Sequence, residues 1–100
     1  MIQHLDNVSA NGDYFITDWE GGNGAFMAVG TWNGATAKVQ VGDGHGNYVD
    51  AGTPTTLTAN GAGGFWWPSG GSTKKMSVKI NVSGVGASTN LALTLTSAEN

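Results

Sequence analysis

One hundred residues with a net charge of −3 allow a single domain with a thin core, and the absence of cysteine excludes disulfides and thiolate metal sites. Four lysines and no arginine argue against nucleic-acid binding, because phosphate recognition needs clustered basic side chains. No apolar run approaches the length of a membrane span, and the first ten residues lack a signal-peptide layout, so we expect neither a membrane partner nor secretion.

The composition predicts an all-β fold. The 17 glycines, 11 threonines and 9 asparagines disfavour helix, because glycine costs a helix interior about 1 kcal/mol and Asn and Thr prefer turns and strands. About seven to eight antiparallel strands, separated by turn signals, are typical of a β-sandwich. We expect one jelly-roll-like β-sandwich domain over residues 1–100, with 1–12 as an extended N-terminal arm and 97–100 as a frayed tail.

In the first half of the chain, strands are expected at 13–18, 26–32, 35–41, 48–51 and 55–59. Asn33-Gly34 separates the second from the third, and Asn-Gly between apolar runs favours a two-residue hairpin turn because both residues take positive φ. In the third strand Ala37, Val39 and Val41 share one face, as in a half-buried strand. The pattern predicts a hairpin of 26–32 with 35–41.

The second half contains the two strands best suited to a core. Glycine- and serine-rich loops at 69–73 and 83–87 bound one of them, and apolar residues alternate with polar ones in both. We predict that the core includes Met76, Val78, Ile80, Leu91, Leu93 and Leu95.

The titratable residues do not form a recognisable catalytic pattern. The acids Asp13, Asp18, Glu20, Asp43 and Asp50 lie at strand ends and in glycine-rich loops, where solvated or turn-capping roles are usual. His4 and His45 are not near a nucleophile motif, and hydrolase, metalloprotease and phosphate-loop motifs are missing. We therefore expect a protein that is not an enzyme, with no catalytic residues and no cofactor.

One loop raises the question of a metal. Residues 43–47, with Asp50, place Asp and Asn oxygens around glycine turns, which suits Ca²⁺. The EF-hand spacing is missing, however, and Asp-Gly and Gly-Asn pairs make ordinary turns unaided. We expect a plain turn and no metal site.

Four tryptophans in a chain of this size are unusual. Trp66 and Trp67 are adjacent, so in an extended segment their side chains face opposite sides. Two interpretations stand: the indoles fill a small core, or some of them bind a protein or a sugar. Because glycine-rich stretches flank residues 65–68 on both sides, we expect a projecting aromatic tip. The candidate interface residues are Phe65, Trp66, Trp67, Trp32 and Tyr48.

The run from Gly30 to Gln40 (GTWNGATAKVQ), followed by Asp43-Gly44, the strand 48–50 and the segment 56–61 (TLTANG), resembles a pattern of small virion proteins of tailed bacteriophages. The resemblance spans residues 24–96, and the chain departs from it by carrying Trp-Trp-Pro-Ser-Gly at 66–70. It implies a structural head decoration (cement) protein that binds the major capsid protein on the outside of the capsid and stabilises it.

The resemblance also implies synthesis in the host cytoplasm, a final location on the virion surface, and a homo-oligomer on the capsid. An alternative from another functional class remains open. A carbohydrate-binding β-sandwich module of a tail fibre or a glycosidase would use Trp66, Trp67 and Tyr48 as a stacking platform.

Overall fold

The computed structural model describes residues 2–16, 19, 21–43, 45–68 and 77–97. These residues form nine strands and one short 3-10 helix. In chain order the elements are β1 (Ile2–Val8), β2 (Gly12–Ile16), β3 (Gly22–Thr31), β4 (Thr36–Gly42), β5 (Tyr48–Asp50), η1 (Thr53–Thr55), β6 (Thr56–Leu57), β7 (Gly61–Trp67), β8 (Ser77–Ser83) and β9 (Asn90–Ser97).

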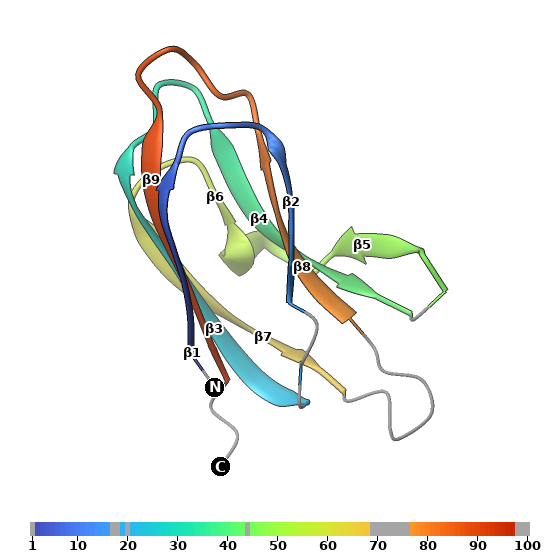
Figure 1. Ribbon diagram of the computed structural model, residues 1–100. Helices are drawn as coiled ribbons and strands as arrows, with labels where there is room; N and C mark the ends of the chain where they lie inside the picture. The colour runs from blue at the N-terminus through green and yellow to red at the C-terminus, as the bar shows by residue number, and fades with distance from the viewer. Residues whose placement is uncertain (1, 17–18, 20, 44, 69–76, 98–100) are drawn as a thin grey trace.

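The strands form two antiparallel sheets packed face to face (Figure 1). Sheet A has the order β1-β9-β3-β7, and sheet B has the order β2-β8-β4-β5, with β6 also paired to β4. The pairs β1–β9, β2–β8, β3–β7 and β4–β5 are nested along the chain and alternate between the two sheets. This is the strand order of a jelly roll. The predicted jelly-roll-like β-sandwich is confirmed, with nine strands because the two-residue β6 is counted.

Period-two alternation decides which side chains enter the core between the sheets. In β4, β8 and β9 every second residue is buried and apolar, and the residues between them face outward. The predicted core residues Val78, Ile80, Leu91, Leu93 and Leu95 are buried, whereas Met76 lies outside the described residues.

The turn at Asn33-Gly34 forms, but it does not make the predicted hairpin. Both residues have positive φ, 46° and 91°, and the amide of Ala35 donates to the carbonyl of Trp32 at 2.9 Å. The flanking strands belong to different sheets: β3 pairs with β7 and β9, and β4 pairs with β5, β6 and β8. Each strand has one buried apolar face, and crossing between the sheets lets these two faces meet across the core. The turn is therefore a corner between sheets.

The first and last strands, β1 and β9, both belong to sheet A, so residues 2–8 form a paired strand where an extended arm was predicted. Residues 2–8 form β1, which pairs with β9 and has a register irregularity between Leu5 and Val8, and Gly12 begins β2. Pairing with β1 places a strand beside the apolar β9, which would otherwise lie at the sheet edge. Ser97 is the last residue of β9 and pairs with Gly24, while 98–100 lie outside the described residues.

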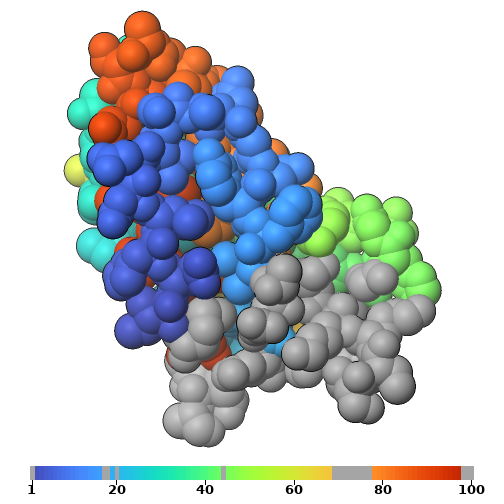
Figure 2. Space-filling model, in the orientation of Figure 1, coloured from blue at the N-terminus to red at the C-terminus, as the bar shows by residue number. Residues whose placement is uncertain are grey.

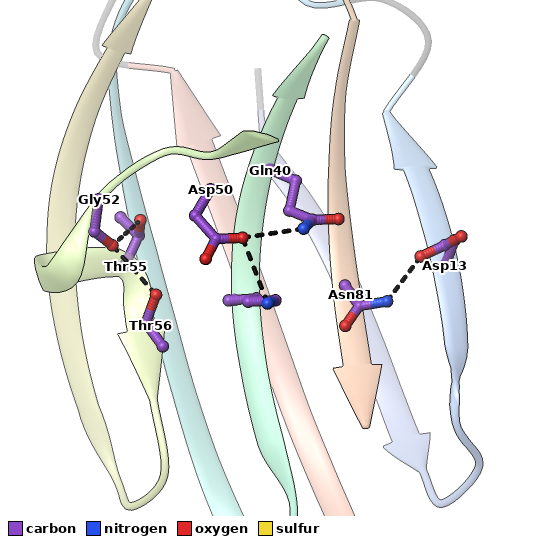
Figure 3. Close-up of polar contacts among 8 residues, drawn as sticks. Asp13, Gln40, Asp50, Gly52, Thr55, Thr56 and Asn81 are labelled. Carbon is purple, nitrogen blue, oxygen red and sulfur yellow. Dashed lines mark hydrogen bonds and ion pairs between the residues drawn. The ribbon is translucent and has the colours of Figure 1, made fainter. Parts of the chain in front are cut away.

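The segment 65–67 ends strand β7 and is not a projecting tip. The glycines before it, expected in a loop, are part of the same strand, which pairs with β3 over its whole length. A Cβ on Gly63 would collide with the carbonyl of Pro54, so its missing side chain lets η1 pack against β7. The carbonyl of Gly52 holds η1 by accepting the hydroxyls of Thr55 at 3.2 Å and Thr56 at 3.1 Å (Figure 3). Only Thr56 and Leu57 of the expected strand 55–59 are extended.

Candidate functional site

The two outer faces of the sandwich differ in charge. The outer face of sheet B carries Asp13 on β2, Lys79 on β8, Lys38 on β4 and Asp50 on β5. Lys79 Nζ lies 3.1 Å from Asp13 Oδ2, and Lys38 Nζ lies 3.2 Å from Asp50 Oδ1. Both lysines of the described part of the chain therefore have an acidic partner on a neighbouring strand of the same face.

Amide side chains extend this network across sheet B. Asn81 Nδ2 donates to Asp13 Oδ1 at 2.8 Å, and Gln40 Nε2 donates to Asp50 Oδ1 at 2.9 Å (Figure 3). The bond from Asn81, with the ion pair to Lys79 as a second cause, holds the pKa of Asp13 below its ordinary value. The bond from Gln40, followed by the ion pair to Lys38, lowers the pKa of Asp50 in the same way. Both carboxylates therefore have hydrogen-bond and ion-pair partners within the chain.

Two aromatic rings of the same face also have an intramolecular partner. The rings of Phe15 and Tyr48 meet edge to face, with centroids 6.0 Å apart. The ammonium of Lys79 lies 4.5 Å from the Tyr48 centroid and 5.6 Å from that of Phe15, which is a cation–π geometry. The predicted interface residue Tyr48 is thus half-buried in a cluster on sheet B.

The outer face of sheet A has a different character. Strands β3, β7 and β9 contain no Asp, Glu, Lys, Arg or His at any position. Their outward residues form a surface of small, apolar, amide and hydroxyl side chains: Asn23, Ala25, Met27, Val29, Ala62, Gly64, Trp66, Ala92, Thr94 and Thr96. We call these residues the neutral face. Among the described residues of sheet A, titratable side chains come only from the far edge strand β1, as His4 and Asp6.

Of the five large exposed apolar side chains among the described residues, three lie on sheet A and two, Phe15 and Val49, lie on sheet B. Trp66 is 60% exposed and Met27 is 51% exposed, both on the neutral face, and Ile2 on β1, level with Thr96, is 65% exposed. The indole of Trp66 makes no hydrogen bond or ring contact with another described residue, although its backbone pairs with Asn23 in the sheet. Figure 2 shows the molecule from the side of β1 and β2, which form adjacent edges of the two sheets.

The structure separates the five predicted interface residues. The predicted opposition of the adjacent tryptophans is confirmed: Trp66 faces out, whereas Trp67 turns inward and donates its Nε1 proton to the carbonyl of Gly42 at 3.0 Å. Phe65 also turns inward and stacks on Trp19, with centroids 5.2 Å apart. Trp32 lies beside the β3–β4 turn and donates to Asn60 Oδ1 at 2.9 Å. Trp66 alone of the five lies on the neutral face.

Met27 and Ile2 were not among the predicted interface residues. Alternation does not identify Met27, because residues 25–29 are all apolar and either set of alternate residues could face the core. No local signal marks Ile2, whose position depends on the pairing of β1 with β9.

In the loop considered for calcium, the carboxylate of Asp43 accepts its hydrogen bonds from the loop itself. Asp43 accepts bonds from the backbone amides of His45 and Asn47, at 2.7 and 3.3 Å, and from the Asn47 side chain at 2.8 Å. The Asn47 side-chain bond, followed by the His45 amide, lowers the pKa of Asp43. Among the described residues, no three His, Asp, Glu or Cys side chains gather as a metal site would require, and no pocket is present there.

The described part of the chain has no helix with the length and hydrophobicity needed to cross a bilayer. When the chain is compared with protein-family models, curated proteins and solved structures, none of them matches it.

Proposed function

We propose that this protein is a non-enzymatic structural component of a tailed-bacteriophage virion that binds the outside of the capsid. The neutral face of sheet A, with Trp66 exposed on it, is the observation that carries the proposal. The sequence resemblance to small virion proteins supports the identity of the partner, the major capsid protein.

The physical character of the neutral face suits a protein partner. Burying it desolvates no charged group, so the cost of bringing a second surface against it is low. Trp is the residue most often found at the energetic centre of protein interfaces, where a large indole is fully desolvated. An exposed indole on a chain with only 11% charged residues promotes non-specific association unless a partner covers it.

The opposite outer face is less suited to this role. Its lysines and carboxylates already bond to one another, and a partner would have to desolvate or replace these pairs. We therefore assign capsid binding to sheet A, with Trp66 as its main contact.

The three rings expected to form a sugar-stacking platform do not lie on one surface. Trp66 faces out of sheet A, Trp67 turns into the sandwich, and Tyr48 packs on the outer side of sheet B. These three rings cannot stack against one saccharide chain. A single-ring sugar site at Trp66 is kept as an outcome of the test.

The test is a binding measurement between the purified chain and heads assembled from a tailed-phage major capsid protein. Trp66→Ala is expected to keep its melting temperature and to weaken head binding by about 30-fold or more, since a central Trp contributes at least about 2 kcal/mol. Val49→Ala is the matched control, because Val49 is 62% exposed but lies on β5 of sheet B.

If both variants decorate heads as well as the wild type does, the assignment to the neutral face is wrong. If the wild type ignores heads but binds a neutral glycan array through Trp66, the carbohydrate-binding function replaces the structural one.

A further inference from the structure

The neutral face is built so that it can meet a copy of itself. Ala25 on β3 and Gly64 on the edge strand β7 are directly paired, at the centre of the stretch in which Asn23 to Met27 pair with Trp66 to Ala62. Along β7, Trp66 lies two residues to one side of this pair and Ala62 two residues to the other, and along β3 the same holds for Asn23 and Met27. A large side chain and a small one therefore lie at equal distances from the centre on β7.

Two such faces can be related by a two-fold axis that lies between them. The axis runs across the strands at the level of Ala25 and Gly64. The rotation reverses the strand direction, so it sets Trp66 of each copy against Ala62 of the other and Met27 against Asn23. An isologous interface requires this arrangement, in which one surface carries both the protruding group and the space that receives it.

Gly64 supports close approach at the centre. Its φ is not in the left-handed region, and a Cβ there would meet only the carbonyl oxygen of Gly24, at 3.4 Å, an ordinary contact. Neither the backbone conformation nor internal packing requires glycine at this position. Glycine inside a strand often marks a place where another backbone comes close.

Charge selects a second copy over a charged partner. A two-fold contact sets each residue against another residue of the same face, so an ionisable group on an otherwise neutral face would be buried without an opposite charge to pair with. The outer face of sheet B would place Asp and Lys networks against each other, whereas β3, β7 and β9 carry no ionisable residue. The neutral face can therefore pair with itself without repulsion.

We propose that the free protein forms a two-fold dimer through the neutral face, centred on Ala25 and Gly64. The dimer covers Trp66 and Met27 and keeps the chain from associating non-specifically. This dimer forms in the absence of a capsid, so the inference goes beyond the proposed function. If the protein both dimerises and binds capsids through this face, the dimer must dissociate before the face can bind a capsid.

The area of the neutral face sets the expected affinity of the dimer. The three strands of the neutral face, about 4.8 Å apart and about seven residues long at about 3.4 Å each, give roughly 340 Å² in projection. That is less than the ~800 Å² that each partner buries in a standard stable interface. The dimer should accordingly be reversible, dissociating at low micromolar concentration.

Sedimentation equilibrium of the purified chain, from about 5 µM to about 1 mM, tests the proposal without capsids. The wild-type mass should rise from that of one chain toward that of two. Met27→Lys should stay monomeric through this range, because it places two like charges at the interface while its flexible stem keeps the strand intact. Val49→Lys adds the same charge at a similarly exposed site on sheet B and should dimerise like the wild type. Melting temperatures measured at low concentration show whether each variant is folded.

A wild type that remains monomeric at every concentration overturns the dimer and leaves capsid binding through Trp66 intact. Dimerisation of folded Met27→Lys, or its loss in folded Val49→Lys, also overturns the proposal, because either result places the contact elsewhere. If Met27→Lys is not folded, Ala62→Gln takes its place, since it fills the position that receives Trp66, and its dimerisation would overturn the proposal equally.

Discussion

At the scale of single residues, three of the four indoles have assigned acceptors. Trp19 donates to the carbonyl of Trp67 at 2.7 Å, Trp32 to Asn60 at 2.9 Å and Trp67 to Gly42 at 3.0 Å. An indole N–H turned inward without an acceptor would lose stability, so these bonds allow aromatic bulk to fill a core that is poor in leucine. Three indoles therefore pack inside the sandwich, as the first interpretation predicts, and the fourth, Trp66, is exposed.

Neighbouring glycines of β7 should respond differently to the same substitution. In Gly63→Ala the new methyl group meets the Pro54 carbonyl, which must move away from the strand, so we expect a loss of about 1–3 kcal/mol in unfolding free energy. Gly64→Ala, on the outward side of the same strand, should change stability by less than about 0.5 kcal/mol. Urea denaturation of both variants is the measurement. Equal losses would mean that η1 does not depend on Gly63.

At the scale of the elements, the late strands β8 and β9 pair with strands from the first half of the chain. Each is a central strand of its sheet: β8 lies between β2 and β4, and β9 lies between β1 and β3. Their alternating apolar residues supply much of the buried interior. Removing a methyl-rich side chain from either strand leaves a cavity bounded by both sheets.

Leu93→Ala on β9 should lower the unfolding free energy by about 2–5 kcal/mol, because the surrounding sheets cannot collapse into the space. Its matched control is Thr94→Ala, whose side chain points outward from the next position of the strand. Thermal melting distinguishes them. Similar melting temperatures for Leu93→Ala and the wild type would show that this face of β9 is not the buried one.

The β4–β5 loop should behave as a turn and not as a metal site. Its central carboxylate, Asp43, already accepts three bonds from within the loop. We expect the melting temperature to stay the same in millimolar Ca²⁺ and in EDTA, since a ligand that binds only the folded state would raise it. A rise in Ca²⁺ that EDTA reverses would establish a calcium site here.

At the scale of the whole molecule, charge is distributed unevenly between the two sheets. The ionic groups of sheet B bond across strands β2, β8, β4 and β5, and three strands of sheet A carry none. On the outer face of sheet B the charged groups are therefore paired with one another. On the outer face of sheet A, burial against a partner desolvates few charged groups.

Stability should fall in acid. The pKa values of Asp13 and Asp50 on sheet B and of Asp43 in its loop all lie below the ordinary 3.8, owing first to side-chain amide bonds. Groups with a lower pKa in the folded state stabilise it fully above the unfolded value, and this contribution is lost as the pH falls through 3.8 and below. The urea midpoint should be level from about pH 7 to pH 5 and then decrease.

Asp13→Asn is the control for this decrease, because it removes one titrating group and should make the acid slope shallower. A midpoint that rises as the pH falls below 4 would contradict the lowered pKa values.

The candidate site was only partly predictable from the sequence. Adjacency of Trp66 and Trp67 fixed that one of them faces out, because side chains alternate along a strand. Which indole is exposed depends on the pairing of β7 with β3 and on the acceptor that Gly42 offers to Trp67. The neutral face depends on three strands that are distant in sequence and adjacent only in the sheet.

By itself, the sequence determined the all-β class, the alternating core of β4, β8 and β9, and the turn at Asn33-Gly34, because each depends on local backbone preference or a period of two. Only the tertiary structure decided that this turn joins two sheets, that residues 2–8 form a paired strand, and that the glycines of 61–64 belong to a strand. These features arise from hydrogen bonding between strands far apart in the chain, and from apolar faces that must meet across one core. Neither is encoded in a short stretch of residues.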